Sequence, residues 1–255
     1  MNTRNNIIAL IIIVIAFSGC KKNSVEPLPS TITAKTTNTS NAGYTPINIG
    51  DVRQIVNLAD SSTILMNIVG TRKRSDSVDV FIMEWTYGTQ PPDTLYYLIK
   101  DGFFTGTNIT ADSNSVNPFE EQRIGKVNPV NNETWQNFIG YSDSSFVIAS
   151  YYKDRSTLCG TFPDVYGFTF TYRSSGIIDT ILTAFYADNI GYIRTDYNKN
   201  AQGLTWEASY IKVANQVYGT LWPAKDLSSP GLSKRSVSNN IIVNAYSLLG
   251  NKDVR

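Results

Sequence analysis

The sequence predicts a mainly β protein: a single curved antiparallel sheet of meander topology, forming a half-barrel or partial barrel, with one or two short helices. Three observations predict this class. Aromatic residues make up 12% of the chain and include 15 Tyr, and such residues favour strands. Short apolar-rich runs alternate with turn residues, and the helical period is weak nearly everywhere. In the clearest runs, large apolar side chains occupy every second position, as in a sheet with one packed face.

The first element of the chain is a leader. Arg4 supplies a positive charge, residues 7–17 form an unbroken apolar run, and small residues then end at Cys20. This order is typical of a secretory signal, and the apolar run is shorter than the about 20 residues that a membrane-spanning helix needs. We therefore expect residues 1–19 to be a signal peptide that is removed.

The residues that end the leader indicate a lipid anchor. Phe17-Ser18-Gly19-Cys20 resembles the lipobox of bacterial lipoproteins, with Phe17 at the place where Leu is most common. The resemblance implies that Cys20 becomes the acylated first residue of the mature protein, so that the membrane is a partner of the chain. Several acyl chains make such an anchor lasting. In lipoprotein sorting, Lys21 rather than Asp after the cysteine implies the outer membrane, and either side of that membrane is left open.

The mature chain divides into three parts. Residues 20–46 comprise the lipidated Cys and a tether rich in Ser, Thr, Asn and Pro, a composition that is typical of disorder. Residues 47–222 hold the antiparallel β domain. Residues 223–255 form a C-terminal extension in which the strand pattern is lost, although residues 240–249 are apolar enough to dock or form a last short element.

The β domain is expected to contain a succession of strands bounded by Gly, Asp, Asn, Ser or Pro. They cover residues 62–70, 77–87, 93–100, 145–153, 165–173, 178–187, 190–197 and 203–213. Because sequential strands joined by short turns usually pair with each other, this order predicts a meander. Residues 49–59 and 133–141 are the helix candidates. Residues 101–132 carry less strand signal, and we expect them to run over one rim of the sheet.

Three short motifs in this domain resemble those of Bacteroidota lipoproteins of unknown function. They are CGTFPDVY from Cys159 to Tyr166, FYADNIGYIR from Phe185 to Arg194, and IGDV from Ile49 to Val52. Asn189 and Ile190 replace the usual Gly and Val of the second motif. The resemblance implies a β half-barrel with a concave apolar face, like that of the periplasmic lipoprotein carriers (LolA and LolB). It implies no catalytic residue.

The residue types of the second motif also predict its local structure. Asn tolerates a positive φ, so Asp188-Asn189 can form a tight reversal between two strands. The missing side chain of Gly191 permits a bulge or a close backbone contact just inside the next strand. These motifs are therefore structural.

Composition excludes several classes of function. The chain has no His, so it cannot by itself build a Ser-His-Asp or Cys-His site, and Cys20 and Cys159 are its only cysteines. The chain has 22 Lys+Arg and 21 Asp+Glu, and loss of a leader containing Arg4 leaves equal numbers. A nucleic-acid-binding protein would show a basic excess. We expect no nucleic acid, cofactor or metal, and no catalytic activity. Cys159 is expected to be a small core residue.

Aromatic residues are the candidates for ligand binding. If the half-barrel is open, its concave face can bind a hydrophobic ligand, and if its Trp residues are exposed they can stack on a glycan. The alternative is that most of these residues form the core. The concave candidates are Tyr166, Phe168, Phe170 and Trp206, and the candidates for exposure outside the predicted strands are Trp135 and Trp222.

Side chains that carry oxygen atoms are the remaining candidates for catalysis or metal binding. A glycosidase needs two carboxylates on opposite sides of a cleft. For each candidate carboxylate, the alternative to a catalytic role is that its side chain simply faces the solvent. The carboxylates considered are Glu84, Glu120, Glu121, Glu133 and Glu207. The loops at 76–79 and 112–115 could bind calcium but lack EF-hand spacing. The sequence thus favours a lipid-anchored, non-catalytic binding or scaffolding module of the cell envelope, with a hydrophobic ligand as one option. The alternative is a glycan-binding or carbohydrate-active lipoprotein.

Overall fold

The computed structural model describes residues 43–138, 145–174, 177–197 and 204–226, all within one compact unit that spans residues 36–255. These residues form one antiparallel sheet, and they contain no helix, so none that could cross a membrane. The strands are β1 (Val52–Asn57), β2 (Thr63–Lys73), β3 (Asp79–Tyr87), β4 (Asp93–Lys100), β5 (Phe103–Thr107), β6 (Gln122–Lys126), β7 (Thr134–Gln136), β8 (Ser145–Thr157), β9 (Gly160–Ser174), β10 (Ile177–Ala187), β11 (Gly191–Tyr197), β12 (Thr205–Val213) and β13 (Gln216–Gly219).

The sheet is built from two meanders. Strands β1 to β6 pair in sequence order, as do strands β7 to β12, and β13 folds back on β12. The two meanders join where β1 pairs with β12, with Ile55 opposite Ala208. Every predicted strand is present, and the predicted mainly β class and meander topology are confirmed.

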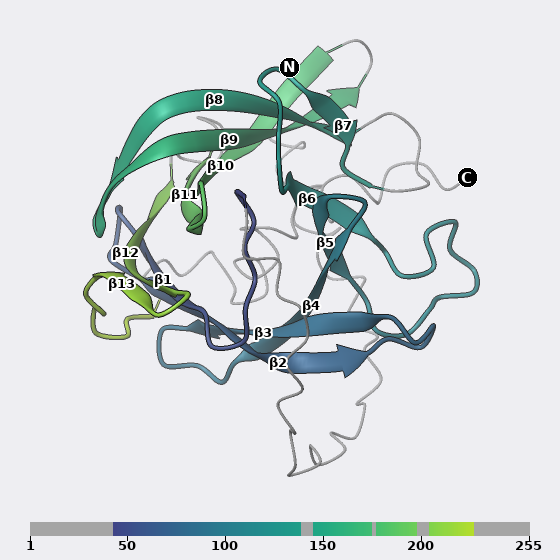
Figure 1. Cartoon of the computed structure of the whole chain (residues 1–255), viewed down its shortest axis with the longest axis horizontal. Coiled ribbons are helices and arrows are strands. Elements are labelled where there is room, and N and C mark those ends of the chain that lie inside the picture. Colours follow the sequence, from purple (N-terminus) through teal and green to yellow (C-terminus); the bar gives the residue numbers. More distant parts are fainter. Residues whose placement is uncertain (1–42, 139–144, 175–176, 198–203, 227–255) are drawn as a thin grey trace, which may run out of the picture. The chain divides into compact units, whose positions relative to one another are not determined.

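The sheet curls until its two edges meet (Figure 1). Gln122 of β6 forms a bridge with Phe138, just after β7. Beside it, the Arg123 amide donates to the Asn137 carbonyl over 2.7 Å. The sheet is therefore nearly closed into a barrel, and its edge strands cover each other instead of offering unpaired backbone groups.

The predicted helices are wrong. Residues 49–59 contain β1, and almost all of this strand is buried on both faces. A strand buried on both faces does not alternate, so its sequence lacks the period that marks a half-buried strand. Residues 133–141 contain β7, in which Trp135 pairs with Val147, and residues 139–141 lie outside the described residues. The segment 101–132 is likewise not only a rim excursion, because it includes β5 and β6.

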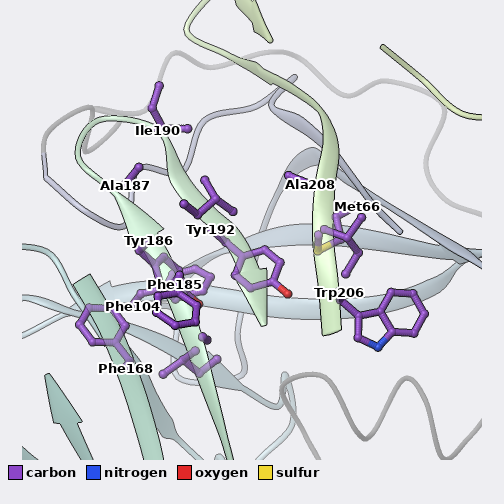
Figure 2. Close-up of a cluster of buried hydrophobic side chains, with 14 of the residues drawn as sticks. Met66, Phe104, Phe168, Phe185, Tyr186, Ala187, Ile190, Tyr192, Trp206 and Ala208 are labelled. Carbon is purple, nitrogen blue, oxygen red and sulfur yellow. The ribbon is translucent and has the colours of Figure 1, made fainter. Parts of the chain in front are cut away.

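Large aromatic side chains fill the inside of the sheet (Figure 2). The Phe168 ring lies 5.4 Å from that of Trp135 and 5.0 Å from that of Tyr186. Gly125 makes room for this packing, since a Cβ there would come within 2.8 Å of the Phe168 ring and 3.1 Å of Thr45. The side chains of residues 172–181, which include Tyr172 of the predicted alternation, lie outside the described part.

Residues 43–47, the plug segment, enter the core ahead of β1. Thr45, Pro46 and Ile47 are buried. The Tyr44 amide donates to the Val127 carbonyl, and the Asn189 amide donates to the Gly43 carbonyl, each over 2.9 Å. The last residues of the segment that we predicted as tether are thus part of the folded core.

Residues 220–226, the strap, run along the outside of β1, β2 and the turn after β3. The Gln54 side chain binds both backbone groups of Trp222, donating to its carbonyl (2.8 Å) and accepting from its amide (2.6 Å). Farther along, Lys225 and Thr63 exchange hydrogen bonds of 3.0 and 3.1 Å. Asp226 accepts from the amide and hydroxyl of Thr89, both over 3.0 Å.

Candidate functional site: a tyrosine cluster at the rim of the sheet

The predicted concave binding residues form the core of the sheet. Phe168, Phe170, Trp206 and also Trp135, which we predicted to be exposed, are buried. A cavity lined mainly by the plug segment and strands β1, β2 and β3 has a volume of only about 30 Å³. Ligand pockets for drug-sized molecules are about 300–1,000 Å³. These side chains therefore act as packing, and the cavity beside the plug has no room for an acyl chain.

Tyr166 lies where this core reaches the rim. Its ring contacts those of Tyr44, with centroids 4.8 Å apart, and Tyr151, at 5.6 Å, both edge-to-face. Tyr151 and Tyr166 are directly opposite each other on β8 and β9, while Tyr44 comes from the plug segment. The side chain exposure of Tyr151, 44%, makes it the accessible member of this rim tyrosine cluster (Tyr44, Tyr151 and Tyr166).

Exposed polar side chains surround the rim tyrosine cluster. The Tyr151 hydroxyl donates to Asp164 Oδ1 over 2.7 Å, and the Tyr151 amide donates to Asn131 Oδ1 over 2.9 Å. The Asp188 amide donates to the Asp164 carbonyl over 3.1 Å, which brings the two carboxylate-bearing residues together. Asn189 adds an amide group and donates to Asp188 Oδ2 over 2.9 Å.

Local backbone geometry creates this arrangement. Asp164 has a φ of 50° and Asn189 a φ of 56°, in the left-handed region that Asp and Asn tolerate best after Gly. The predicted reversal at Asp188-Asn189 is confirmed as the β10–β11 turn. The expectation for Gly191 is confirmed as well, because a register shift follows it and a Cβ there would come within 2.8 Å of Arg53.

The surroundings of the rim raise the pKa of two of its tyrosines, Tyr44 and Tyr151. Burial first, and then the charges of Asp188 and Asp164, raise the pKa of Tyr44 to about 12. The hydrogen bond to Asp164, and then burial, raise the pKa of Tyr151 above its ordinary value. The site therefore presents neutral aromatic faces beside two carboxylates and two amides. Such a surface can stack on a sugar ring and hydrogen-bond its hydroxyls, and it repels anions.

Trp222 is exposed, as we predicted, but belongs to another surface. It lies on the strap with 38% of its surface accessible, next to the more exposed Leu221. Its backbone is held by Gln54, and the structure does not bring it together with the rim tyrosine cluster.

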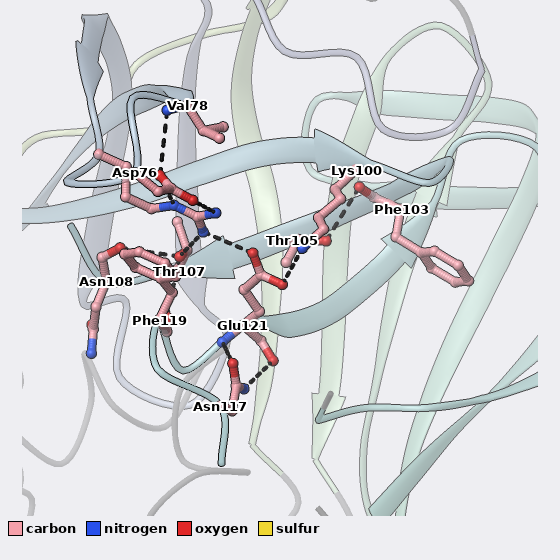
Figure 3. Close-up of polar contacts among 11 residues, drawn as sticks. Asp76, Val78, Lys100, Phe103, Thr105, Thr107, Asn108, Asn117, Phe119 and Glu121 are labelled. Carbon is pink, nitrogen blue, oxygen red and sulfur yellow. Dashed lines mark hydrogen bonds and ion pairs between the residues drawn. The ribbon is translucent and has the colours of Figure 1, made fainter. Parts of the chain in front are cut away.

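Four of the five candidate carboxylates are engaged by neighbouring side chains. Glu121 pairs with Arg74 and Lys100 (Figure 3), Glu133 with Lys126, and Glu207 with Arg194. Glu120 accepts from Asn108 over 2.7 Å, and Glu84 lies half-buried on β3. Three of these carboxylates are thus held in separate ion pairs, and these contacts do not oppose two carboxylates across a cleft.

The loops considered for calcium use their oxygens locally. Asp76 pairs with Arg74 and Asp79 with Lys73, while Asp112 accepts from the Asn114 amide over 2.9 Å. Within the described residues, no group of three or more His, Cys, Asp or Glu side chains is arranged to hold a metal ion.

The two cysteines are in different parts of the chain. Cys159 is half-buried, with its Sγ 3.3 Å from Thr157 Oγ1, and burial raises the pKa of its thiol. Cys20 and the leader lie outside the described residues.

Tyr44 is the member of the rim tyrosine cluster that our sequence analysis missed. We assigned it to the tether, yet it is the only aromatic residue between Lys21 and Pro46. A lone aromatic residue in a polar segment, shortly before the first strand, is the signal that could have marked the start of the folded part.

Comparison with known proteins adds two distant structural likenesses. No family model and no curated protein matches the sequence. An exported-type protein with a YmcC-like fold from Bacteroides fragilis is 12% identical, with a TM-score of 0.37, and the match covers 67% of this chain and 99% of that one. A lipoprotein-type chain from Parabacteroides distasonis is 16% identical, with a TM-score of 0.33, and the match covers 69% and 98%. Similarity at this level does not establish a shared function.

Proposed function

We propose that this protein is a lipid-anchored, non-catalytic binding module of the cell envelope, and that it binds neutral glycans at the rim tyrosine cluster. The observation that carries the proposal is the exposed ring of Tyr151, supported from behind by Tyr166 and flanked by Asp164 and Asn131. Flat aromatic faces beside planar polar side chains suit a sugar, which has apolar C–H faces and a ring of hydroxyls.

The sequence alone supports the location that we propose. The leader and the lipobox-like residues ending at Cys20 support export and acylation, and Lys21 supports the outer membrane. A glycan ligand is compatible with either side of that membrane.

A hydrophobic ligand inside the sheet is the less favoured option. It would have to displace side chains such as Phe168 and Trp206, which are almost completely buried. Removing a large aromatic side chain from a packed core costs about 3–5 kcal/mol, and displacement would forfeit the same contacts.

The proposal of a non-catalytic role rests on the surroundings of the carboxylates. A retaining or inverting glycosidase needs one carboxyl kept protonated and another kept ionised on opposite sides of a bond. Glu121 and Glu133 instead have lowered pKa values, because hydrogen bonds from cationic side chains outweigh the effect of their burial. Neither is poised to act as a general acid near neutral pH.

Titration calorimetry with neutral oligosaccharides tests the binding site. We expect cellohexaose, maltohexaose or mannohexaose to bind the wild-type protein, and Tyr151→Ala to weaken binding by about tenfold because the stacking face is lost. Tyr96→Ala is the matched control, since Tyr96 is a half-buried Tyr on β4, away from the rim. Equal affinity in Tyr151→Ala and wild type, or no affinity for any of the three sugars, would contradict the proposal.

A further inference from the structure

Arg53 is a cation buried inside the sheet. It lies on β1, only 6% of its surface is exposed, and it lines the cavity of about 30 Å³ beside the plug segment. Most of the other residues around this cavity are apolar, among them Ile47, Met66 and Met83. An arginine in such surroundings stays charged and needs compensation for the water that it has lost.

The guanidinium of Arg53 is only partly satisfied by the protein. Its Nη2 donates to the Ile190 carbonyl over 2.7 Å. Its Nε is fully buried, and no described residue accepts a hydrogen bond from it. The hydroxyl of Thr45, which lines the same cavity, is also buried and has no partner among the described residues. Two residues with unsatisfied donors therefore line the same small cavity.

No direct counter-charge is available within the described part of the chain. The charge of Asp51 acts on Arg53, but Asp51 directs its hydrogen bonds elsewhere. Asp51 Oδ2 instead accepts from the amide and the side chain of Asn48, over 3.0 and 3.2 Å, and Oδ1 accepts from the Ala214 amide over 3.4 Å. Asp51 thus holds two turns together, and the Nε of Arg53 has no acceptor among the described residues.

The backbone around the guanidinium is shaped to receive it. Gly191 has a φ of +87°, and a Cβ there would lie 2.8 Å from Arg53 Nη2 and 3.3 Å from Pro46. Only a glycine lets the β11 strand pass this close to the guanidinium. The backbone of β11 therefore helps to fix the position of the Arg53 guanidinium.

We propose that the cavity binds a chloride ion, which accepts hydrogen bonds from Arg53 Nε and Thr45 Oγ1. One negative charge would neutralise the buried guanidinium and satisfy both orphaned donors. The volume suits one or two particles of water size, which admits a halide and excludes sulfate, phosphate and organic carboxylates larger than formate. Bound water alone would satisfy the donors but leave the charge, and is the competing occupant.

Thermal unfolding in chloride and in gluconate tests this proposal, because gluconate supplies the same ionic strength but does not fit. A ligand that binds only the folded state raises its stability in proportion to the logarithm of its concentration once the site is filled. We expect the Tm of the wild-type protein to rise by several degrees as sodium chloride replaces sodium gluconate. A Tm that is equal in the two salts would overturn the proposal.

Three variants test whether the rise of Tm with chloride comes from this cavity. In Thr45→Val, which keeps the shape but lacks the hydroxyl, we expect the chloride concentration at half-maximal effect to rise severalfold. In Arg53→Met the chloride response should be lost, and Lys73→Gln, which removes an exposed cation on β2, should leave it unchanged. A Thr45→Val protein with the wild-type midpoint would count against the assignment, even if Arg53→Met does not fold.

Crystals grown with sodium bromide give a direct readout. Bromide scatters anomalously and resembles chloride in size and charge. We expect an anomalous peak between Arg53 Nε and Thr45 Oγ1. Density in the cavity without an anomalous signal would identify water and overturn the proposal.

Discussion

Arg74 shows at the scale of single residues what a fully satisfied buried cation looks like in this protein. Its Nε and Nη2 donate to the two oxygens of Asp76 over 2.9 and 2.7 Å, and its Nη1 donates to Glu121 Oε1 over 2.7 Å. Glu121 also accepts from Lys100 Nζ over 2.7 Å (Figure 3), and the ring of Phe119 lies 3.9 Å below the guanidinium. Arg53 has no such partners, since its Nη2 donates to the Ile190 carbonyl and its Nε has no acceptor among the described residues.

The Arg74–Glu121 contact predicts a pH dependence of stability. Burial alone would raise the pKa of Glu121, but hydrogen bonds from Lys100 and Arg74 outweigh it and lower the pKa below its ordinary value of 4.5. A carboxyl with a lowered pKa in the folded state stabilises the protein above its ordinary pKa, and this contribution disappears as the pH falls through the lowered value. We expect Glu121→Gln to reduce the free energy of unfolding by about 2 kcal/mol at pH 7.

Urea unfolding at several pH values checks this prediction. The difference between wild type and Glu121→Gln should shrink as the pH is lowered below 4.5. Asp79→Asn is the matched control, because its pair with Lys73 is exposed and should change stability by less than about 1 kcal/mol. A difference that is constant with pH would show that Glu121 does not carry the effect.

At the scale of elements, the plug segment packs against the inner surface of the sheet and the strap packs against its outer surface. The plug segment enters the core before β1, and the strap runs outside β1 and β2 after β13. Gln54 connects the strap to the sheet, since its buried side chain binds both backbone groups of Trp222 and accepts from Ser209 Oγ over 2.9 Å. A side chain amide thus replaces the backbone pairing that a further strand would have provided.

Gln54→Ala should release the strap. The substitution removes three hydrogen bonds and leaves the Trp222 amide and carbonyl without these partners, so we expect a loss of about 2–3 kcal/mol in the free energy of unfolding. Hydrogen exchange of the Trp222 amide should become faster than that of the β-sheet amides. The control is Gln216→Ala, since Gln216 is exposed on β13 and accepts only from Tyr218. Unchanged protection of the Trp222 amide in Gln54→Ala would contradict this role of Gln54.

At the scale of the whole molecule, the curvature of the sheet decides where function can lie. The bridge between β6 and Phe138 brings the two edges together, and aromatic side chains occupy the space inside. A nearly closed and filled sheet offers its rims and outer surface to ligands rather than its concave face.

The lipid anchor that we propose at Cys20 gives a further prediction. We expect Cys20→Ala to abolish fatty-acid labelling and to move the protein from the membrane fraction to the soluble fraction, because the acyl chains provide the binding energy. Cys159→Ala should keep both labelling and membrane association, which makes it the matched control. Labelling that persists in Cys20→Ala would show that the lipobox-like residues are not the modification site.

The sequence by itself determined the β class, the meander and most of the strands, because alternation directly records that one face of a strand is buried. It also determined the Asp188-Asn189 turn and the role of Gly191, which depend on local backbone preferences. Only the tertiary structure decided that residues 49–59 and 133–141 contain strands, since β1 is buried on both faces and does not alternate, and the three-residue β7 is too short to show a period. It also decided that Phe168 and Trp206 are packing rather than a binding surface. The roles of Tyr44, Tyr151 and Arg53 depend on partners distant in the sequence, and such contacts leave no periodic signal in it.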